Sequence, residues 1–564
     1  MASQAIYSST SAAGSGSASI SSSSPLVESL NGALSAVQDG FMRLPGSAIL
    51  LRYVRSSYQN DPIRSLLELI LIIFALRTIL QSRTRGNSSS SNFVKLTEKE
   101  IDDLVDEFNP DPLCAPLSAA DQQELASVPT IIGAVSSRPK ISLPSHHAGK
   151  AKEVMNLASY NFIDLAGNEK VKERAIQTLR KYGVGSCSPP GFYGTIDVHM
   201  ALEEDIARFI GVDKCIIYSQ GFSTISSVIP AFSKRGDIIV ADRGVNFAIQ
   251  KGLQVSRSTI KWYDHNSMSS LESVLQSVIR EDKRRRGPLT RRFIITEGIF
   301  EGDGACVDLA RLIALKRKYK FRLILDESIS FGTVGATGRG MTELCEVPPK
   351  EVDILVGNMA NTLGGAGGFC AGTEEVVFHQ RINGTSFVFS AALPAMLAVA
   401  SSTAIQRLIA QPSLMSSLNE NIAAMRNVLD HVESISIPSH ARSPLIHIQI
   451  RSKFEPHPET PFDKIDRSHL AQARALPPSY NGHDLDQAEQ TRLLQSIVDD
   501  LIEHGIFLIR HKRLPSINPK MLETGPESRP SIRIAVTTAF TRKEMEKAAN
   551  VIKSSVVRLI GKRR

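Results

Sequence analysis

The sequence predicts an α/β fold: a large domain with a mainly parallel sheet covered by helices on both faces, followed by a smaller α+β domain. Short apolar runs rich in β-branched residues alternate with helical stretches between residues 157 and 397, as strands joined by helical crossovers do. The chain has 564 residues, of which 42% are hydrophobic and 22% charged, an ordinary globular composition. That length is enough for two or three domains with a large core.

The start of the chain differs from the rest in composition. Residues 1–24 are rich in Ser, Ala and Gly and nearly uncharged, so we expect a disordered tail. They also lack the basic start and apolar centre of a signal peptide. In the region 25–92, apolar residues recur at helical spacing up to Tyr58, which predicts an amphipathic helix at a membrane surface or against a partner.

A strongly apolar segment follows at residues 63–80. It is close to the length of about 20 residues that a transmembrane helix needs, although Glu68 is costly within a bilayer. We expect this segment to be a membrane helix that spans the bilayer, with an in-plane or buried helix as the alternative. Arginines flank both of its ends, so the distribution of positive charge does not determine its orientation.

The rest of the chain is expected to contain three parts. Residues 93–156 form a linker and N-terminal arm, with a helix over 97–108 that Thr97 and Glu100 begin as a capping box. Residues 157–397 form the large domain, and 398–564 the small domain, which a polar insertion at 452–487 interrupts as a surface loop. The strands predicted for the large domain are 215–218, 238–241, 293–296, 323–326 and 354–356.

Cysteine usage and charge exclude several classes of function. The six cysteines are scattered without a CxxC pair, which argues against a metal site and a disulfide framework and favours a reducing compartment. The net charge of +8 includes a basic cluster at residues 283–292, which we interpret as a solvated loop. Because no aromatic residues are interleaved with this cluster and no nucleic-acid module is present, nucleic acid is not an expected partner.

Several polar and glycine-rich motifs occur in order over about 240 residues. Residues 182–187 read Tyr-Gly-Val-Gly-Ser-Cys, and residues 199–203 read His-Met-Ala-Leu-Glu. The turn of Ser219, Gly221 and Phe222 follows a predicted strand and begins a helix, where backbone N–H groups are available to a phosphate. Asp326 ends another predicted strand, within Asp-Glu-Ser-Ile-Ser-Phe-Gly.

Together these motifs resemble those of the α-oxoamine synthases, enzymes that use pyridoxal phosphate (PLP) to join an amino acid to an acyl-CoA. The resemblance implies a PLP-dependent transferase of fold type I, with an aminotransferase-like large domain. It also implies that the turn at Ser219, Gly221 and Phe222 cradles the PLP phosphate. Asp326 matches the carboxylate that keeps the pyridine nitrogen protonated.

Three positions depart from the family pattern. The family motif Gly-Thr-Phe-Ser-Lys-x-x-Gly-Gly aligns its lysine with Asn361, and no lysine occurs between Lys350 and Lys453. A carboxamide cannot form a Schiff base with PLP or take a proton from the substrate as an amine can. Asn246 and Ile329 stand where the family has two active-site histidines. We therefore expect no catalytic residue in this chain.

Within the family, this combined loss is similar to one branch, the lysine-lacking long-chain-base subunits that pair with a lysine-bearing homologue. The similarity runs from about residue 62 to the C-terminus. It implies a heterodimer at the endoplasmic reticulum membrane with the main body in the cytosol, acting in the first step of sphingolipid biosynthesis. The partner would hold PLP covalently, and small regulatory membrane subunits are possible further partners.

Family active sites lie at the dimer interface, so a chain without the lysine can still shape the site of its partner. By the same resemblance, Cys187, Phe192, Tyr193 and Ser390 are expected at the interface near that site. For Cys187, a buried and inert thiol is the alternative. Two other functions stay open: a stand-alone α-oxoamine synthase, and a lipid-synthesis scaffold without catalysis.

Overall fold

The computed structural model describes residues 46–88, 96–108, 110, 114, 116–142, 151–285, 290–452, 485–512 and 529–561. The chain divides into two compact units, Met1–Pro116 and Leu117–Arg564. The predicted disordered tail at 1–24 and most of the predicted insertion at 452–487 lie outside the described residues.

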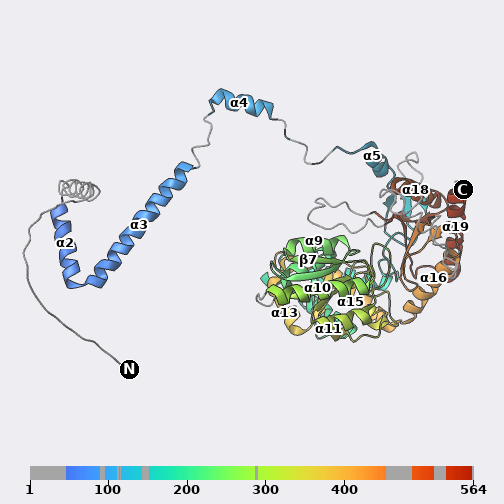
Figure 1. Cartoon of the computed structure of the whole chain (residues 1–564). Coiled ribbons are helices and arrows are strands. Elements are labelled where there is room, and N and C mark those ends of the chain that lie inside the picture. The colour runs from blue at the N-terminus through green and yellow to red at the C-terminus, as the bar shows by residue number, and fades with distance from the viewer. Residues whose placement is uncertain are drawn as a thin grey trace, which may run out of the picture. The chain divides into compact units, whose positions relative to one another are not determined.

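Among its described residues, the first unit contains three helices. They are α2 (Ser47–Asn60), α3 (Pro62–Ser88) and α4 (Glu98–Glu107) (Figure 1). The Ser65 hydroxyl donates to the Ser57 hydroxyl at 3.0 Å and thereby joins α2 to α3. The predicted capping box is confirmed: the backbone N–H of Glu100 donates to Thr97 Oγ1 at 3.3 Å, and that of Thr97 donates to Glu100 Oε2 at 2.7 Å.

The transmembrane prediction for residues 63–80 requires a correction. Within the described part of the chain, no helix is both long and apolar enough to cross a membrane. The segment does form helix, but Arg64, Glu68 and Arg77 interrupt its apolar sequence. Arg64 Nε pairs with Glu68 Oε1 at 3.1 Å on the surface of α3. An in-plane or buried helix, the alternative, stays a prediction.

A seven-stranded sheet organises the second unit, in the order β5-β11-β10-β9-β8-β6-β7. β11 runs antiparallel to its two neighbours, and the remaining pairs are parallel. All five predicted strands are present, whereas β7 and β11 were not predicted. The strands are β5 (Lys214–Tyr218), β6 (Ile238–Asp242), β7 (Thr259–Tyr263), β8 (Arg292–Glu297), β9 (Arg322–Asp326), β10 (Ile354–Asn358) and β11 (Gly368–Gly372).

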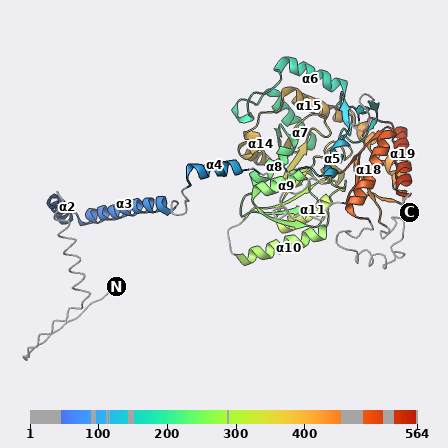
Figure 2. The ribbon, with the colours of Figure 1, turned by 90° about the horizontal axis from the view of Figure 1, so that it is seen from above.

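Helices pack around this sheet in groups. α15 packs against α6 and α7, while α8 packs against α9. Figure 2 shows α6, α7 and α15 at one side of the unit and α10 and α11 at the other. The helices are α6 (Glu169–Tyr182), α7 (Asp197–Ile210), α8 (Gly221–Phe232), α9 (Phe247–Ser256), α10 (Met268–Arg285), α11 (Leu309–Tyr319), α12 (Met341–Leu344), α13 (Glu374–Asn383), α14 (Thr385–Val388) and α15 (Ala395–Ala410), with 3-10 turns η1 (Pro190–Phe192) and η2 (Pro349–Glu351).

The C-terminal part of the unit is an α+β arrangement around a second sheet, in the order β12-β13-β16-β15. The N-terminal arm joins it, because β4 (Met155–Asn156) pairs with β14 (Ile506–Phe507). α15 crosses the predicted boundary at 397/398, and that boundary stays a prediction. The other elements are α5 (Ala119–Ala126), β1 (Thr130–Ile132), β2 (Lys140–Ser142), β3 (Lys152–Glu153), α16 (Ser413–Leu429), β12 (Ile435–Ser436), β13 (Leu445–Ile450), α18 (Gln487–Glu503), β15 (Ile509–Arg510), β16 (Ile532–Ala535) and α19 (Arg542–Gly561).

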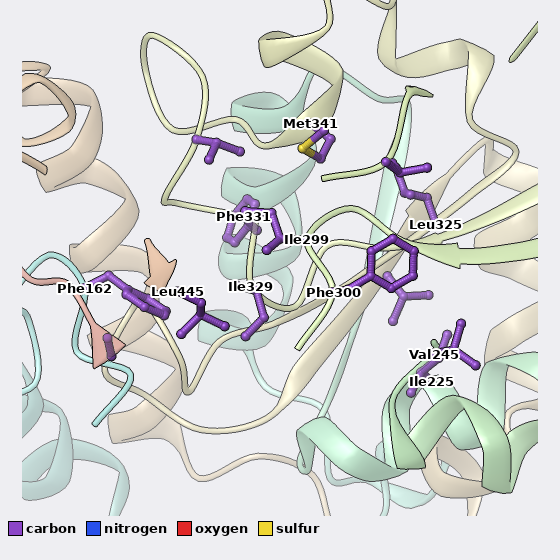
Figure 3. Packing of buried hydrophobic residues seen from close by; sticks show 14 of the residues in the cluster. Phe162, Ile225, Val245, Ile299, Phe300, Leu325, Ile329, Phe331, Met341 and Leu445 are labelled. Atoms are coloured by element: carbon purple, nitrogen blue, oxygen red, sulfur yellow. The ribbon is translucent and has the colours of Figure 1, made fainter. Parts of the chain in front are cut away.

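One continuous hydrophobic core lies beneath both sheets, and part of it is visible in Figure 3. Phe331 packs edge-on against Phe369, with ring centroids 4.9 Å apart. Every residue of β6 is buried, as expected of a strand inside a parallel sheet covered on both faces. The core therefore fixes the strand ends from which the candidate site is built.

Candidate functional site

The site lies where parallel strands end. Glu297 ends β8, Asp326 ends β9, and these two residues are direct neighbours in the sheet. Asn358 ends β10, the next strand. Ligands of open α/β sheets bind outside the carboxyl ends of the strands, so polar side chains gathered there mark the candidate site.

Asp326 is buried, with both carboxylate oxygens occupied by its own chain. The Asn246 amide donates to Oδ2 at 3.0 Å. The Ser328 backbone N–H and hydroxyl donate to Oδ1 at 2.9 and 2.5 Å. Burial raises the pKa of Asp326, and the hydrogen bonds from Ser328 and Asn246 oppose that rise. The carboxylate predicted to hold a cofactor nitrogen is thus already hydrogen-bonded within the protein.

Asn246 does not offer an open face to a ligand. It is the N-cap of α9, and its side-chain oxygen accepts from the Ile249 N–H at 3.0 Å. Its amide nitrogen is the donor to Asp326, and its backbone N–H donates to Glu297 Oε1 at 2.7 Å. Where the family has an active-site histidine, this chain has a helix cap that also donates to the buried Asp326.

Asn361 is likewise turned toward the protein. Its amide donates to the Ser328 carbonyl oxygen at 2.9 Å, and the residue is half-buried. Ser328 therefore receives Asn361 on its carbonyl while its own N–H and hydroxyl bind Asp326. The position of the missing lysine is now part of the hydrogen-bond network around Asp326.

Ile329 is 3% exposed and belongs to the hydrophobic core. Figure 3 shows it among Phe162, Phe300, Phe331 and other buried apolar side chains. An imidazole buried there would lose its hydration. Ile329, the third position that departs from the family pattern, therefore packs in the hydrophobic core.

The predicted phosphate turn keeps its local geometry but not its open space. α8 begins at Gly221, and within the described residues its N-cap Gln220 makes no side-chain cap. Asn358 lies against this turn: a Cβ added to Gly221 would stand 2.4 Å from Asn358 Nδ2. Asn358 Oδ1 is itself held by the Ala360 N–H at 2.7 Å. Ser219 is half-buried and Phe222 is 52% exposed beside the turn.

Sequence reasoning missed Asn358. The signal was present, because the family motif has threonine three residues before its lysine and this chain has Asn358. With Asn361 in place of the lysine and the Asn358 amide against Gly221, the residues present do not fit PLP bound in the family manner.

Two more buried acids escaped the sequence analysis. Glu297 is 2% exposed, and burial, with Asp326 and Glu301 nearby, raises its pKa well above the ordinary value. Glu327 accepts from the Ser330 hydroxyl at 2.5 Å and from the Met341 N–H at 2.9 Å, and burial raises its pKa to about 7. Glu327 stands in the quoted motif Asp-Glu-Ser-Ile-Ser-Phe-Gly, which was the available signal, whereas no sequence pattern marked Glu297.

The predicted interface residues occupy a different environment. The glycine-rich segment is joined to the segment before α15: the Ser186 hydroxyl donates to the Ala392 carbonyl at 2.7 Å. Phe192 is 57% exposed, Tyr193 is fully exposed, and Cys187 is exposed in this chain. Cys187 and Tyr193 both adopt positive φ, 57° and 72°, which costs energy in residues other than glycine.

A small cavity lies behind this segment, lined by Ser390, Ser219 and His199 among others. In this cavity Ser390, a predicted interface residue, lies close to Ser219 of the predicted phosphate turn. His199 is buried, its Nε2 lies 2.5 Å from the Leu393 carbonyl oxygen, and burial lowers its pKa. In this arrangement the histidine holds two chain segments together.

Comparisons with known proteins concern the family and the fold of this chain. The model of the aminotransferase class I and II family matches residues 152–552. Long chain base biosynthesis protein 1b of Oryza sativa subsp. japonica is 44% identical over 357 residues, covering 63% of this chain and 72% of the rice protein. Serine palmitoyltransferase 1 of Saccharomyces cerevisiae is 34% identical over 539 residues, covering 91% of this chain and 92% of the yeast protein.

A solved structure of SPT with PLP is similar to this chain with a TM-score of 0.63 at 18% identity, covering 78% of this chain and 97% of that chain. At this identity the likeness concerns the fold. It confirms the predicted aminotransferase-like fold type I.

Proposed function

The chain belongs to the serine palmitoyltransferase 1 family, within the aminotransferases of class I and II, and we propose that it is the non-catalytic subunit of a serine palmitoyltransferase. The reaction condenses L-serine with palmitoyl-CoA to 3-oxosphinganine, releasing carbon dioxide and CoA, as the first step of sphingolipid biosynthesis. PLP, when bound to the partner, supplies the electron sink for this chemistry.

The observation that carries the proposal is the hydrogen bond from Asn361 to the Ser328 carbonyl. An amide at the lysine position cannot bind PLP covalently. Because Asn246 also takes the place of a family histidine and already donates to Asp326, restoring the lysine alone would not restore the site. The chain therefore needs a lysine-bearing homologue that holds PLP covalently and performs the reaction.

The exposed glycine-rich loop supports a partner at this surface. Tyr193 is fully exposed and strained, and Phe192 is more than half exposed beside it. Aromatic residues of this kind dominate the energy of protein interfaces. We place Cys187, Phe192, Tyr193 and Ser390 near the active site of the partner, where they shape it without taking part in covalent chemistry.

Helix α3 supports a location at a membrane, and we propose the endoplasmic reticulum, with the second unit in the cytosol, as the resemblance implies. Its apolar side chains are exposed within the first unit; Leu66 is 59% and Phe74 66% exposed. Such a helix gains free energy when lipid or another membrane protein covers it. The same surface is our candidate contact for small regulatory membrane subunits.

The test is to purify the chain from membranes with its associated proteins and to assay the complex. Replacing the lysine of the partner should lower activity at least about a hundredfold. Asn361→Lys in this chain is the matched control, and it should not restore the lost activity. Activity that survives replacement of the partner lysine would overturn the proposal.

Two results would instead support the other functions. A PLP adduct fixed by borohydride to the isolated chain would indicate a stand-alone synthase. Purification without any lysine-bearing homologue would indicate a scaffold.

A further inference from the structure

Basic side chains gather along one edge of the large sheet, opposite the strand ends that carry Asp326 and Asn358. The strands β6, β7, β8 and β9 are parallel, so they all begin at this edge. Ile238, which begins β6, lies opposite Thr259 of β7 and Arg292 of β8. Residues at these strand starts, or just before them, are therefore neighbours although they are far apart in the sequence.

Six exposed cations occupy this edge, and we call them the basic edge. They come from the turn before β6, the end of α9, the end of α10 and the first residue of β9, and they are Lys234, Arg235, Arg257, Lys283, Arg284 and Arg322. An ion pair holds the end of α10 at the edge, since Asp282 Oδ2 lies 2.5 Å from Arg292 Nη2. Lys283 and Arg284 belong to the basic cluster noted in the sequence.

The neighbouring acids bind other groups. Glu281 Oε1 lies 3.2 Å from Lys261 Nζ. Asp237 is buried and accepts the backbone N–H groups of Lys234 and Arg291 at 2.9 and 3.0 Å. Within the described part of the chain, none of the six cations of the basic edge forms an ion pair.

Helix dipoles do not neutralise this charge either. The helices α8, α9, α10 and α11 all end at this edge, because each of them leads into one of the four strands. A helix end supplies only about half a negative charge. Most of the positive charge of the six side chains therefore remains uncompensated within the chain.

The basic edge has almost no exposed apolar surface. Val255, 62% exposed near the end of α9, is the one large apolar residue exposed among the described residues between 233 and 322. Protein interfaces combine an apolar core with a polar rim, and single-stranded nucleic acids stack on aromatic side chains. The edge offers neither feature, whereas a layer of anionic lipid head groups attracts positive charge alone.

We propose that the basic edge binds the anionic head groups of phospholipids at the surface of a membrane. The six cations contact the charged groups of the lipids, while the second unit stays outside the apolar interior of the bilayer. This inference rests on the membrane location proposed for α3, which brings the basic edge near lipid because both units belong to one chain. It goes beyond that location, since it gives the second unit a preference for the charge of the membrane.

The test compares vesicles that differ in charge. The purified full chain is mixed with vesicles of phosphatidylcholine alone, or with about 30% phosphatidylserine as the anionic lipid, and the bound protein is measured by flotation. Each cation near an anionic surface strengthens binding about fivefold, so the anionic vesicles should bind at least about tenfold more tightly. This preference should disappear at about 1 M salt, where charges are screened within about 3 Å.

Variants locate the surface. The double variant Lys283→Gln with Arg284→Gln should weaken binding to the anionic vesicles about tenfold or more, and leave binding to the neutral vesicles unchanged. Arg257→Gln, from another helix, should weaken it about fivefold. Lys170→Gln with Arg180→Gln is the matched control, because these exposed cations lie on α6, at the other side of the unit from α10 (Figure 2).

A second measurement needs no substitution, so it does not depend on the folding of a variant. Lysines of the full chain are acetylated by a soluble reagent and identified by mass spectrometry. Acetylation of Lys234 and Lys283 should be slower on anionic than on neutral vesicles, whereas that of Lys170 should not change.

The outcomes separate this inference from the proposals on which it rests. Binding to the anionic vesicles alone would support the basic edge and remove α3 from the membrane. Equal binding to both kinds of vesicle, or unchanged binding in the basic-edge variants, would overturn the inference and leave the location of α3 in place. Binding to neither kind would overturn both, and the activity of the complex with its lysine-bearing partner tests the proposed function separately.

A competition experiment addresses the other possible occupants. Polyglutamate or an oligonucleotide is added to the chain on anionic vesicles at an equal concentration of charge. If the chain stays on the vesicles, the lipid surface is the preferred ligand. Displacement by either polymer would assign the basic edge to an acidic polymer and overturn the inference.

Discussion

Two regions of the chain differ in what their polar and strained groups contact. They are the candidate site at the ends of β8, β9 and β10, called the pocket below, and the glycine-rich loop of residues 183–194. In the pocket, Asn246, Asn358 and Asn361 all bind their own chain. In the loop, Tyr193 is fully exposed in a strained backbone conformation. The polar groups of the pocket are hydrogen-bonded within the chain, whereas the backbone strain and the exposed aromatic surface of the loop are not compensated within it.

This difference distinguishes two uses of one fold, which are binding a cofactor and presenting a surface to another protein. A site for a cofactor must leave hydrogen-bonding groups available for it, and here Asn246 already donates to Asp326 Oδ2. Strain and exposed aromatic surface, by contrast, persist where something outside the chain compensates for them. In our proposal, the chain has converted its own site into structure and retained an exposed surface for a partner.

The largest effect on activity should come from distorting the glycine-rich loop. A Cβ on Gly194 would stand 1.9 Å from the Ser188 carbonyl oxygen, so Gly194→Ala should distort the loop and lower the activity of the complex more than about tenfold. Gly191→Ala is the matched control, because a Cβ there meets nothing within 4 Å. Equal activities of the two variants would separate the loop from the function of the complex.

The pH dependence of stability should reveal the buried acids of the pocket. The pKa of Glu327 is about 7 in the folded state and 4.5 when unperturbed, so the folded protein holds a proton that the unfolded chain releases between these values. The stabilising contribution of this group is full below pH 4.5 and is lost as the pH rises through 7, by about 3 kcal/mol at most.

Glu327→Gln imitates the protonated form, so its urea-unfolding free energy should depend less on pH across this window. Glu204→Gln, at an exposed position of α7, should leave the dependence unchanged. If both variants keep the slope of the parent protein, Glu327 is ionised in the folded state throughout.

A smaller effect should follow from removing the polar link inside the pocket. Asn246→Ala deletes the cap of α9 and the donor to Asp326, and should lower the free energy of unfolding by about 2 kcal/mol. Asn246→Ser keeps a capping oxygen, so it should lose about half as much. A serine variant as unstable as the alanine variant would mean that capping contributes nothing here.

The smallest change in stability should occur at the outward loop. Tyr193→Ala should alter the unfolding free energy of the isolated chain by less than about 0.5 kcal/mol, since the side chain is fully exposed. Its affinity for the lysine-bearing partner should still fall about tenfold, measured by surface plasmon resonance. Val557→Ala, at an exposed position of α19, is the control, and equal affinities would place the interface elsewhere.

Local patterns predicted much of the fold. The capping box of Thr97 and Glu100 involves residues three apart, and apolar runs marked five of the seven strands of the large sheet. β7 was missed because it is an edge strand that contains Lys261 and is only partly buried. β11 was missed because glycine stands at both of its ends and its antiparallel pairing with β5 joins residues about 150 positions apart.

The prediction of a transmembrane helix was wrong because it gave too little weight to the charged residues within the apolar segment. A run of apolar residues predicted a span, but the charges of Arg64, Glu68 and Arg77 divide the helix that forms. Hydrophobic content alone did not distinguish a helix that crosses a membrane from one that does not.

The sequence by itself determined that Asn361 cannot bind PLP covalently, because that conclusion depends only on which functional group the residue carries. The tertiary structure alone decided what replaces the lost chemistry. Asn246 and Asp326 are 80 positions apart and meet only because β6 and β9 lie in one sheet. Burial at those strand ends makes each polar group find a partner within the chain, since an unpaired group there would be costly.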